Sequence, residues 1–362
     1  MGIPFRPVKT EIIKIDSQYP DINRIVHCAK MIRQGGLVIF PTETVYGIAA
    51  DFSNPRAMQR LREVKKRSSD KPFSILISQS GLISNYTSMT DTALYKLIRA
   101  YWPGPLTIIV PPKREGESTM GVRMPDNLIA LKLVEESQCT MAAPSANIEG
   151  QEPPLTCEEA LKDLDGLADA AIDGGTVAIG RSSSVVDLVH GKPTVLREGV
   201  ITQSDIDRVI NKKTVLFVCT GNSCRSVMAE YLLKNKIKGR ENIEVFSAGT
   251  AVFIRSTASA ETISVLREES IDAMGHVSQP INTILLKQSD LIFVMTRTHR
   301  EQVLERVPAV EKRVYLLKEF ANIPPTSQAD LDIPDPIGSA HQAYQQCLSI
   351  IKEAVDRIEK LV

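Results

Sequence analysis

The sequence predicts two consecutive α/β domains, the second of them a parallel β-sheet covered by helices on both faces. The chain has 362 residues, which exceeds the usual size of one domain. From residue 214 onward, short apolar runs alternate with helical stretches, and this alternation is typical of a parallel sheet. Before about residue 200 the strand candidates are short, and the loops are rich in Pro, Ser and Gly. We therefore expect the first domain to be an α/β fold with long functional loops.

A polar segment, residues 195–213, separates the two halves and is predicted to hold a short helix plus a connector. We expect the first domain at residues 1–200, a linker at 201–213 and the second domain at 214–362.

Each half contains periodic segments that predict its elements. In the first, Met58, Leu61 and Val64 fall on one face of a helix expected over residues 54–67. Its strands are predicted at residues 35–40, 72–78 and 104–112. In the second, strands are predicted at residues 214–219, 243–249, 291–296 and 314–319. A final helix is predicted from helical spacing of Ala343, Tyr344, Cys347, Ile350, Ile351, Ala354, Val355 and Ile358.

Composition narrows the functional class. The 43 basic residues balance 43 acidic ones, which argues against coating nucleic acid or an anionic membrane through bulk charge. The N-terminus has no apolar signal region, and no apolar stretch approaches the roughly 20 residues that span a bilayer. Six scattered cysteines without a CxxC pair favour a reducing compartment. We expect a cytoplasmic protein without membrane contact.

Two cysteines and an arginine lie within "VCTGNSCRS", residues 218–226. A structural zinc site needs four ligands, usually from two spaced pairs, and the sequence shows no second Cys/His pair, so no metal ligand is predicted. Alternatively, both cysteines could be buried in the hydrophobic core without a functional role. The surroundings favour an anion site instead, because a polar loop between a strand and a helix gathers backbone N–H groups at the positive end of the helix.

This anion site predicts nucleophilic chemistry. The guanidinium of Arg225 matches phosphate oxygens, and the local positive field stabilises the Cys219 thiolate for attack on phosphorus. Asp335, in "DIPDPIG", is the candidate proton donor for the leaving group.

Residues 214–362 resemble the low-molecular-weight protein tyrosine phosphatase family, through V-C-x-G-N-x-C-R-S-x-x-A-E at 218–230, "SAGT" at 247–250 and the Asp-Pro pair at 335–336. The resemblance implies a Rossmann-like parallel sheet and hydrolysis through a cysteinyl-phosphate without a cofactor. It assigns Cys219 as nucleophile, Arg225 as phosphate clamp and Asp335 as general acid. The phosphate loop would be supported by Asn222, Ser223, Cys224 and Ser226, and Cys224 can trap oxidised Cys219 as a disulfide. Val227 replaces the proline common in the family.

Three activities compete within this fold. Arsenate reductases share "CTGNSCRS" but need further cysteines near residues 291–308, where this chain has none. The segments "HVSQPI" and "SDLIFVMTRTHR" look most like the bacterial protein-arginine phosphatase branch, and polar Ser223 suits contact with a guanidinium. Phosphotyrosine and phosphoarginine remain alternative substrates, and an inactive phosphate-binding domain is the rival hypothesis.

The first half carries scattered cations with Ser, Thr and Asn loops, a combination that suits a polyphosphate plus a small polar ligand. It has no Walker loop and no G-x-G-x-x-G motif. The motifs P-T-E-T-V-Y-G at 41–47, K-x-R at 65–67, W-P-G-P-L-T at 102–107, V-R-M-P at 122–125 and P-S-A-N at 144–147 resemble those of the YrdC-like threonylcarbamoyl-AMP synthases. That resemblance implies a twisted mixed sheet.

The same resemblance implies condensation of L-threonine, bicarbonate and ATP, with Mg²⁺, into threonylcarbamoyl-AMP and pyrophosphate. The product would pass to tRNA-modification proteins that act on adenosine 37 of ANN-reading tRNAs. Threonine would contact Thr44, Arg123, Ala143 and Ser183. ATP would contact Lys65, Arg67, Lys71, Thr119, Ser145, Pro153 and Arg197. Ser68 and Leu76 depart from the family pattern. The rival hypothesis is a module that only binds RNA or nucleotide.

Overall fold

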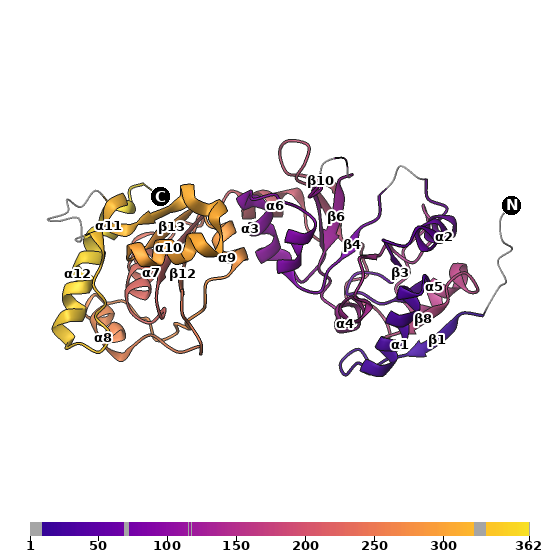
Figure 1. The fold of residues 1–362 in the computed structure, drawn as a ribbon, viewed down its shortest axis with the longest axis horizontal. Coiled ribbons are helices and arrows are strands. Elements are labelled where there is room, and N and C mark those ends of the chain that lie inside the picture. The colour runs from indigo at the N-terminus through magenta and orange to yellow at the C-terminus, as the bar shows by residue number, and fades with distance from the viewer. Residues whose placement is uncertain (1–8, 69–71, 115, 117, 322–330, 362) are drawn as a thin grey trace. The chain divides into compact units, whose positions relative to one another are not determined.

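The computed structural model describes residues 9–68, 72–114, 116, 118–321 and 331–361. The chain forms two compact units, whose elements are labelled in Figure 1. Unit 1 comprises the chain up to Met89 together with Leu97–Asp207, and unit 2 comprises Thr90–Lys96 and the chain from Arg208 onward. Helix α6 (Gln203–Ile210) is the short helix expected between the two halves.

Unit 1 is built on a mixed β-sheet, as expected. Within the described residues its strand order is β1-β8-β2-β3-β7-β4-β6-β5-β9-β10. Parallel pairs such as β1 with β8 occur beside antiparallel pairs such as β2 with β3. The strands are β1 (Glu11–Lys14), β2 (Val38–Phe40), β3 (Gly47–Asp51), β4 (Ile75–Leu76), β5 (Leu106–Val110), β6 (Met120–Arg123), β7 (Met141–Ala142), β8 (Ala170–Asp173), β9 (Ser184–Asp187) and β10 (Thr194–Arg197).

Both faces of this sheet are covered. Ile39 of β2 belongs to one buried cluster, while its neighbours Val38 and Phe40 belong to another, because successive strand side chains point to opposite faces. The helical elements are α1 (Ile22–Arg33), α2 (Pro55–Lys65), η1 (Ser80–Asn85), α4 (Leu128–Ser137) and α5 (Cys157–Leu164). Helix α3 (Thr92–Tyr101), like α6, is divided between the units, since its residues up to Lys96 belong to unit 2.

Helix α2, which directly precedes Lys66 and Arg67, shows how local sequence determines where a helix begins and ends. Asn54 caps its first turn through hydrogen bonds to the N–H groups of Arg56 and Ala57, and Pro55 occupies the first helical position. Met58, Leu61 and Val64 are buried on one face, as predicted. The helix ends at Lys65, because Lys66 adopts a left-handed conformation with φ of 49° and turns the chain toward Arg67.

Unit 2 is a parallel sheet, which confirms the predicted fold class. The strand order is β12-β11-β13-β14, and all three pairings are parallel. The strands are β11 (Lys213–Cys219), β12 (Ile243–Gly249), β13 (Leu291–Val294) and β14 (Val314–Leu316). The helical elements are α7 (Arg225–Lys236), α8 (Ala260–Glu268), α9 (Thr283–Gln288), α10 (Arg297–Arg306), η2 (Pro308–Arg313), α11 (Leu317–Phe320) and α12 (His341–Ile358).

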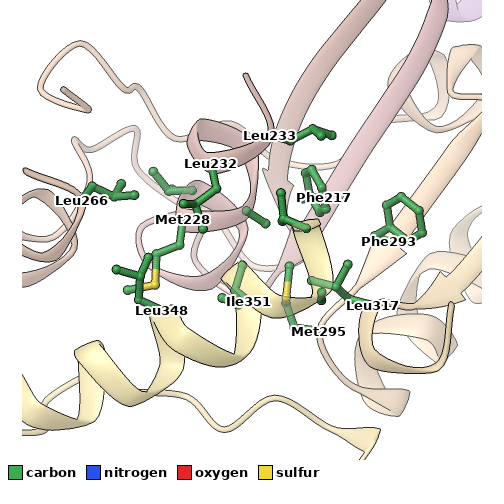
Figure 2. Close-up of a cluster of buried hydrophobic side chains, with 14 of the residues drawn as sticks. Phe217, Met228, Leu232, Leu233, Leu266, Phe293, Met295, Leu317, Leu348 and Ile351 are labelled. Atoms are coloured by element: carbon green, nitrogen blue, oxygen red, sulfur yellow. The ribbon is translucent and has the colours of Figure 1, made fainter. Parts of the chain in front are cut away.

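Strand β11 lies between two cores. Val215 and Phe217 pack in a cluster with residues of α7, α8 and α12, whereas Leu216 and Val218 pack in a cluster with residues of α9 and α10. Figure 2 shows side chains of the first cluster, in which Leu348 and Ile351 of α12 join those of α7 and β11. This packing fixes the carboxyl end of β11, where the loop of residues 220–224 begins.

Two expectations need correction. On α12 the buried stripe includes Leu348, whereas Ala343 and Ile350 are only half-buried, since the stripe that faces the core is narrower than the sequence pattern. The predicted connector after residue 194 begins with β10, which pairs antiparallel with β9 through a register shift between Val195 and Arg197. A short, mostly exposed strand carries too few apolar residues to be recognised from its sequence.

Candidate active sites

Unit 1 contains a cavity of about 280 Å³ that gathers most of the residues predicted for ligand binding. They approach it from separate parts of the sheet and its loops: Arg123 ends β6, Arg197 ends β10 and Ser183 directly precedes β9. The predicted site residues in its wall are Arg67, Thr119, Arg123, Ala143, Ser145, Ser183 and Arg197.

Three guanidinium groups face this one cavity. The pKa of Arg197 is lowered by burial and by the charges of Arg123 and Arg67. Arg67 lies over the ring of Phe73, 5.1 Å from its centroid, and donates to the carbonyl of Pro72 at 2.8 Å. Arg123 is paired with Glu43, whereas Arg67 and Arg197 have no carboxylate partner in the described residues, so an anionic ligand would relieve their repulsion and the cavity suits a phosphorylated compound.

Arg123, which lines the cavity, forms a buried polar cluster with Thr44 and Glu43, which do not. Nη2 of Arg123 donates to Oγ1 of Thr44 at 2.9 Å and to Oε1 of Glu43 at 2.6 Å, and Nε donates to the carbonyl of Gly104 at 3.1 Å. Thr44 is fully buried and is not part of the cavity wall, so in this structure it acts by orienting Arg123. Sequence reasoning assigned no role to Glu43, although it lies inside the quoted P-T-E-T motif.

Ser183 is fixed in the wall by two partners. Its hydroxyl lies 2.9 Å from Oγ1 of Thr107 and accepts from Nη2 of Arg197 at 3.1 Å. Nε of Arg197 donates to the Ser183 carbonyl at 3.0 Å. Thr107 also lines the cavity and was not assigned in advance. Its only sequence signal was its place at the end of W-P-G-P-L-T.

Lys65 lies beside the cavity rather than in its wall. The side chain is 2% exposed, and Nζ donates to the carbonyls of Ser145, at 2.6 Å, and Asn147. Burial, and the charge of Arg67, lower the pKa of Lys65 to about 8. The ammonium therefore holds the loop that carries Ser145, and contact with phosphate would require it to leave these carbonyls.

The remaining predicted residues lie elsewhere. Pro153 is half-buried outside the cavity wall, and Lys71 lies outside the described residues. Leu76, one of the two departures from the family pattern, is 4% exposed and contributes an apolar wall. Ser68, the other departure, is exposed and also lies outside the wall.

In unit 2, the anion site is predicted in the loop between β11 and α7. Cys219 ends β11, α7 begins at Arg225, and Sγ of Cys219 lies 3.0 Å from Oγ of Ser226 in the first turn of that helix. A Cβ on Gly249 would clash with the Thr220 carbonyl, so a glycine here lets β12 approach the loop. Cys219, the candidate nucleophile, is thereby held at the amino end of α7, where the helix dipole favours negative charge.

Asn222 holds the loop in shape. It adopts φ of 53°, a left-handed conformation that Asn tolerates better than most residues. Its Nδ2 donates to Oγ of Ser226 at 3.0 Å and of Ser247 at 2.7 Å, and its Oδ1 accepts from the N–H of Gln279 at 2.9 Å. The Ser247 hydroxyl in turn donates to Glu230, so a buried polar network supports the loop.

Arg225 and Asp335 are brought together from distant parts of the chain. Nη2 of Arg225 contacts Oδ2 of Asp335, and Nη1 donates to the Ile333 carbonyl at 3.1 Å. Nε of Arg225 is buried without a hydrogen-bond partner in the described part of the chain. The guanidinium thus retains a donor for an anion next to the candidate general acid.

His299 was missed by sequence reasoning, although it lies in a segment quoted for its resemblance. Its Nε2 lies 2.9 Å from Oγ1 of Thr220, and its Nδ1 lies 3.0 Å from Oγ1 of Thr296. Burial, then the charge of Arg225, lower the pKa of His299 to about 4, so the ring is neutral near pH 7. Spacing along the chain gives no signal for this contact, because His299 and Thr220 are 79 residues apart.

Ser223 and Cys224, at the end of the same loop, contact residues near α8 and α12. Sγ of Cys224 lies 3.5 Å from Oγ of Ser259 and 3.9 Å from the Tyr344 hydroxyl. All six cysteines, including Cys219 and Cys224, are free thiols. The Ser223 carbonyl accepts from the N–H of Ser259 at 3.0 Å, which ties the loop to the start of α8.

Comparison with protein families divides the chain in the same place as its motifs. Residues 30–199 match the Sua5/YciO/YrdC family, described as telomere recombination, and residues 214–362 match the low molecular weight phosphotyrosine protein phosphatase family. The chain belongs to both families. Over 148 residues it is 36% identical to a protein-arginine-phosphatase from Geobacillus stearothermophilus and covers 95% of that relative.

The first half has relatives of two lengths. It is 37% identical over 195 residues to the threonylcarbamoyl-AMP synthase of Bacillus subtilis, and the match covers 52% of this chain and 56% of that protein. The chain therefore spans little more than half the length of this relative. It covers 95% of a shorter relative from Methanocaldococcus jannaschii, at 33% identity.

A solved structure is similar in fold. A Pyrococcus abyssi Sua5 structure, described as complexed with L-threonine, is similar with a TM-score of 0.53 and 26% identity, over 85% of this chain and 99% of that one. Among the residues that the structure describes, no helix is long and apolar enough to cross a membrane. The described residues also contain no cluster of three or more His, Cys, Asp or Glu side chains arranged for a metal.

Proposed function

We propose that the chain is a bifunctional enzyme, with a threonylcarbamoyl-AMP synthase in unit 1 and a cysteine-dependent protein phosphatase in unit 2. One observation supports each activity above all others. In unit 1 it is the convergence of Arg67, Arg123 and Arg197 on one cavity. In unit 2 it is the nucleophile Cys219 in contact with Ser226, at the start of the helix that carries Arg225.

The synthase takes L-threonine, bicarbonate and the magnesium complex of ATP. The threonine amine combines with bicarbonate, releasing water, and an oxygen of the resulting carbamate attacks the α-phosphorus of ATP with loss of pyrophosphate. Such a reaction requires positioning and neutralisation of charge rather than a covalent nucleophile. Arg67 and Arg197, whose side chains have no ion-pair partner in the described residues, are suited to the phosphates.

The remaining assignments of this site are part of the same proposal. Threonine contacts Arg123, Ser183 and the backbone of Ala143, with Thr44 behind Arg123. ATP contacts Thr119, Ser145, Lys71 and the backbone of Pro153, and Lys65 supports the loop of Ser145. The product passes to tRNA-modification proteins that transfer the threonylcarbamoyl group to adenosine.

The synthase activity is tested by pyrophosphate release from ATP. Release that depends on both threonine and bicarbonate is expected from the intact chain. An Arg67→Ala variant should bind ATP more weakly and lose most of this release. If saturating substrates give no pyrophosphate, the unit is a nucleotide- or RNA-binding module instead.

The phosphatase forms and then hydrolyses a cysteinyl-phosphate. The thiolate of Cys219 attacks phosphorus, Arg225 and the loop N–H groups hold the phosphoryl oxygens, and Asp335 gives a proton to the leaving group. The Asp335 carboxylate then accepts a proton from the water that attacks the intermediate, and phosphate is released. Nη2 of Arg225 contacts Asp335 in the ligand-free chain, so a phosphoryl oxygen that takes over this donor frees the Asp335 carboxyl to meet the leaving group.

Phosphoarginine in a protein is the substrate that we propose. Ser223 is small and polar, and a relative that this chain covers almost completely is named a protein-arginine-phosphatase. Rates on matched phosphoarginine and phosphotyrosine peptides test this choice, with Cys219→Ser as the inactive control. Faster hydrolysis of phosphotyrosine would reverse the assignment without affecting the mechanism.

We also propose a cytoplasmic location, in which six free cysteines are compatible with a reducing compartment. The domain boundaries that we propose are residues 1–200 and 214–362, joined by 201–213. Expressing each half alone and measuring its activity tests these boundaries.

A further inference from the structure

The guanidinium of Arg225 in unit 2 is anchored to two separate segments. Nη1 donates to the Ile333 carbonyl at 3.1 Å, and Nη2 contacts Oδ2 of Asp335. Nη2 also donates a long hydrogen bond, of 3.5 Å, to Oγ1 of Thr220. Ile333 and Asp335 lie on one loop, whereas Thr220 directly follows β11 and begins the loop of residues 220–224. Thr220 is therefore an anchor that does not depend on the loop of the candidate general acid.

This anchor is needed when a phosphoryl group binds. Nη2 carries two N–H groups, so one can stay with Thr220 while the other passes from Asp335 to a phosphoryl oxygen. Nε of Arg225 is buried without a partner in the described residues and is free for a second phosphoryl oxygen. Once Asp335 has left, the Thr220 hydroxyl still holds Nη2 in the orientation that two-pronged phosphate binding requires.

The Thr220 side chain is exposed, and a freely rotating hydroxyl would be a poor anchor. His299 restrains it, because Nε2 lies 2.9 Å from Oγ1 of Thr220 and Nδ1 lies 3.0 Å from Oγ1 of Thr296. Burial, then the charge of Arg225, lower the pKa of His299 to about 4, so the ring is neutral near pH 7. A neutral ring can accept the Thr220 proton at Nε2 while Nδ1–H donates to Thr296. The lone pairs of the Thr220 oxygen then remain for Arg225.

The position of His299 is fixed by the start of helix α10. Thr296 caps this helix by accepting the N–H of His299 at 3.3 Å, and the ring is 4% exposed. Val303 of the same helix packs with Val218 of β11 in one buried cluster. The imidazole and the loop that follows β11 are therefore tied to the same core.

We propose that His299 is a positioning residue of the phosphatase, which orients the Thr220 hydroxyl and through it the guanidinium of Arg225. This inference rests on the phosphatase activity proposed above. The imidazole acts through Thr220 and not on the phosphoryl group. It keeps Arg225 in place while Asp335 moves between the guanidinium and the leaving group.

Kinetics of the full chain with 4-nitrophenyl phosphate test this role, with inorganic phosphate as the competitive inhibitor. This small aryl ester makes the result independent of the protein substrate, and competition reports on the phosphatase site alone, even when phosphate also binds to unit 1. Thr220→Val removes the hydroxyl and keeps the side-chain shape, and His299→Leu removes both ring nitrogens. Each should lower kcat/KM and raise the Ki of phosphate by about threefold to tenfold, as expected for the loss of one hydrogen bond.

A double-mutant cycle shows whether the two residues act through each other. The chain with both Thr220→Val and His299→Leu should be no more impaired than either single variant. His299→Gln places an amide near the position of Nε2 and should recover most of the lost phosphate affinity. His341→Leu is the matched control, because this exposed histidine at the start of α12 pairs with Glu268. It should leave kcat, KM and Ki unchanged.

An unchanged Ki of phosphate in both single variants overturns the proposal even where kcat falls, because a loss of folded enzyme lowers kcat alone. Losses that multiply in the double variant overturn it as well, and so does a His299→Gln chain as impaired as His299→Leu. If His299→Leu does not fold, the other two variants decide: Thr220→Val should weaken phosphate binding and His299→Gln should not, and any other pattern overturns the role. A wild-type chain that does not hydrolyse the ester refutes the phosphatase activity itself, which is a separate outcome.

Discussion

Replacing Asn222 by alanine should strongly destabilise unit 2. The side chain makes three hydrogen bonds, to Ser226, Ser247 and the N–H of Gln279. At about 1 kcal/mol for each bond, their loss costs about 3 kcal/mol. The Cβ of asparagine already crowds the following carbonyl at φ of 53°, so alanine adds no steric cost there. The free energy of unfolding of unit 2 should therefore fall by about 3 kcal/mol.

Asn222→Gly separates the hydrogen bonds from the backbone strain. It loses the same hydrogen bonds but adopts a positive φ freely, so it should be about 1 kcal/mol more stable than Asn222→Ala. Urea unfolding is measured with two probes. The single tryptophan, Trp102, reports on unit 1 and should show no shift. Pulsed thiol labelling of buried Cys347 reports on unit 2.

A loss of less than about 1 kcal/mol in Asn222→Ala would refute this reasoning, since even one buried bond is worth that much. Equal stability of the alanine and glycine variants would refute only the backbone contribution. Phosphatase kcat should fall in both variants, because Ser226 loses the partner that orients its hydroxyl toward Cys219.

Three further results are expected. Cys219→Ser should abolish phosphatase turnover while the chain still binds tungstate and releases pyrophosphate; measurable turnover would exclude Cys219 as nucleophile. Lys65→Met should weaken ATP binding by about tenfold, because the Ser145 carbonyl loses its charged donor; unchanged affinity in calorimetry would contradict this. The pKa of His299 is about 4 when folded and rises to an ordinary value near 6.5 on unfolding, so stability should decrease as pH falls from 6.5 toward 4, by about 3 kcal/mol in total. His299→Gln should remove most of that slope in pH-dependent urea unfolding, and an unchanged slope would assign it to other groups.

Much of the fold followed from local patterns. Helix α2 was predicted because its apolar spacing and its Asn-Pro start are read within a few residues. Strand β11 and the loop after it were predicted for the same reason. Strand β10 was missed because its four residues are mostly exposed, and their strand conformation depends on pairing with β9.

In the candidate sites, too, residues within contiguous motifs were predicted, whereas contacts between distant residues were not. The motifs named Arg67, Arg123 and Arg197, but contiguous motifs do not tell which of them has a carboxylate partner. Glu43 meets Arg123 across 80 residues, and only packing of β6 beside the loop before β3 brings them together.

By itself, the sequence determined the alternation of strands and helices in unit 2, helix α2, the cysteine loop and the candidate residues of both sites, because helix periods, caps and contiguous motifs act over short distances along the chain. Tertiary structure decided which charges are compensated, which hydroxyls face a histidine and which polar atoms stay without a partner. Those properties depend on distances between residues far apart in sequence, and such distances are set by how sheets and helices pack rather than by spacing along the chain.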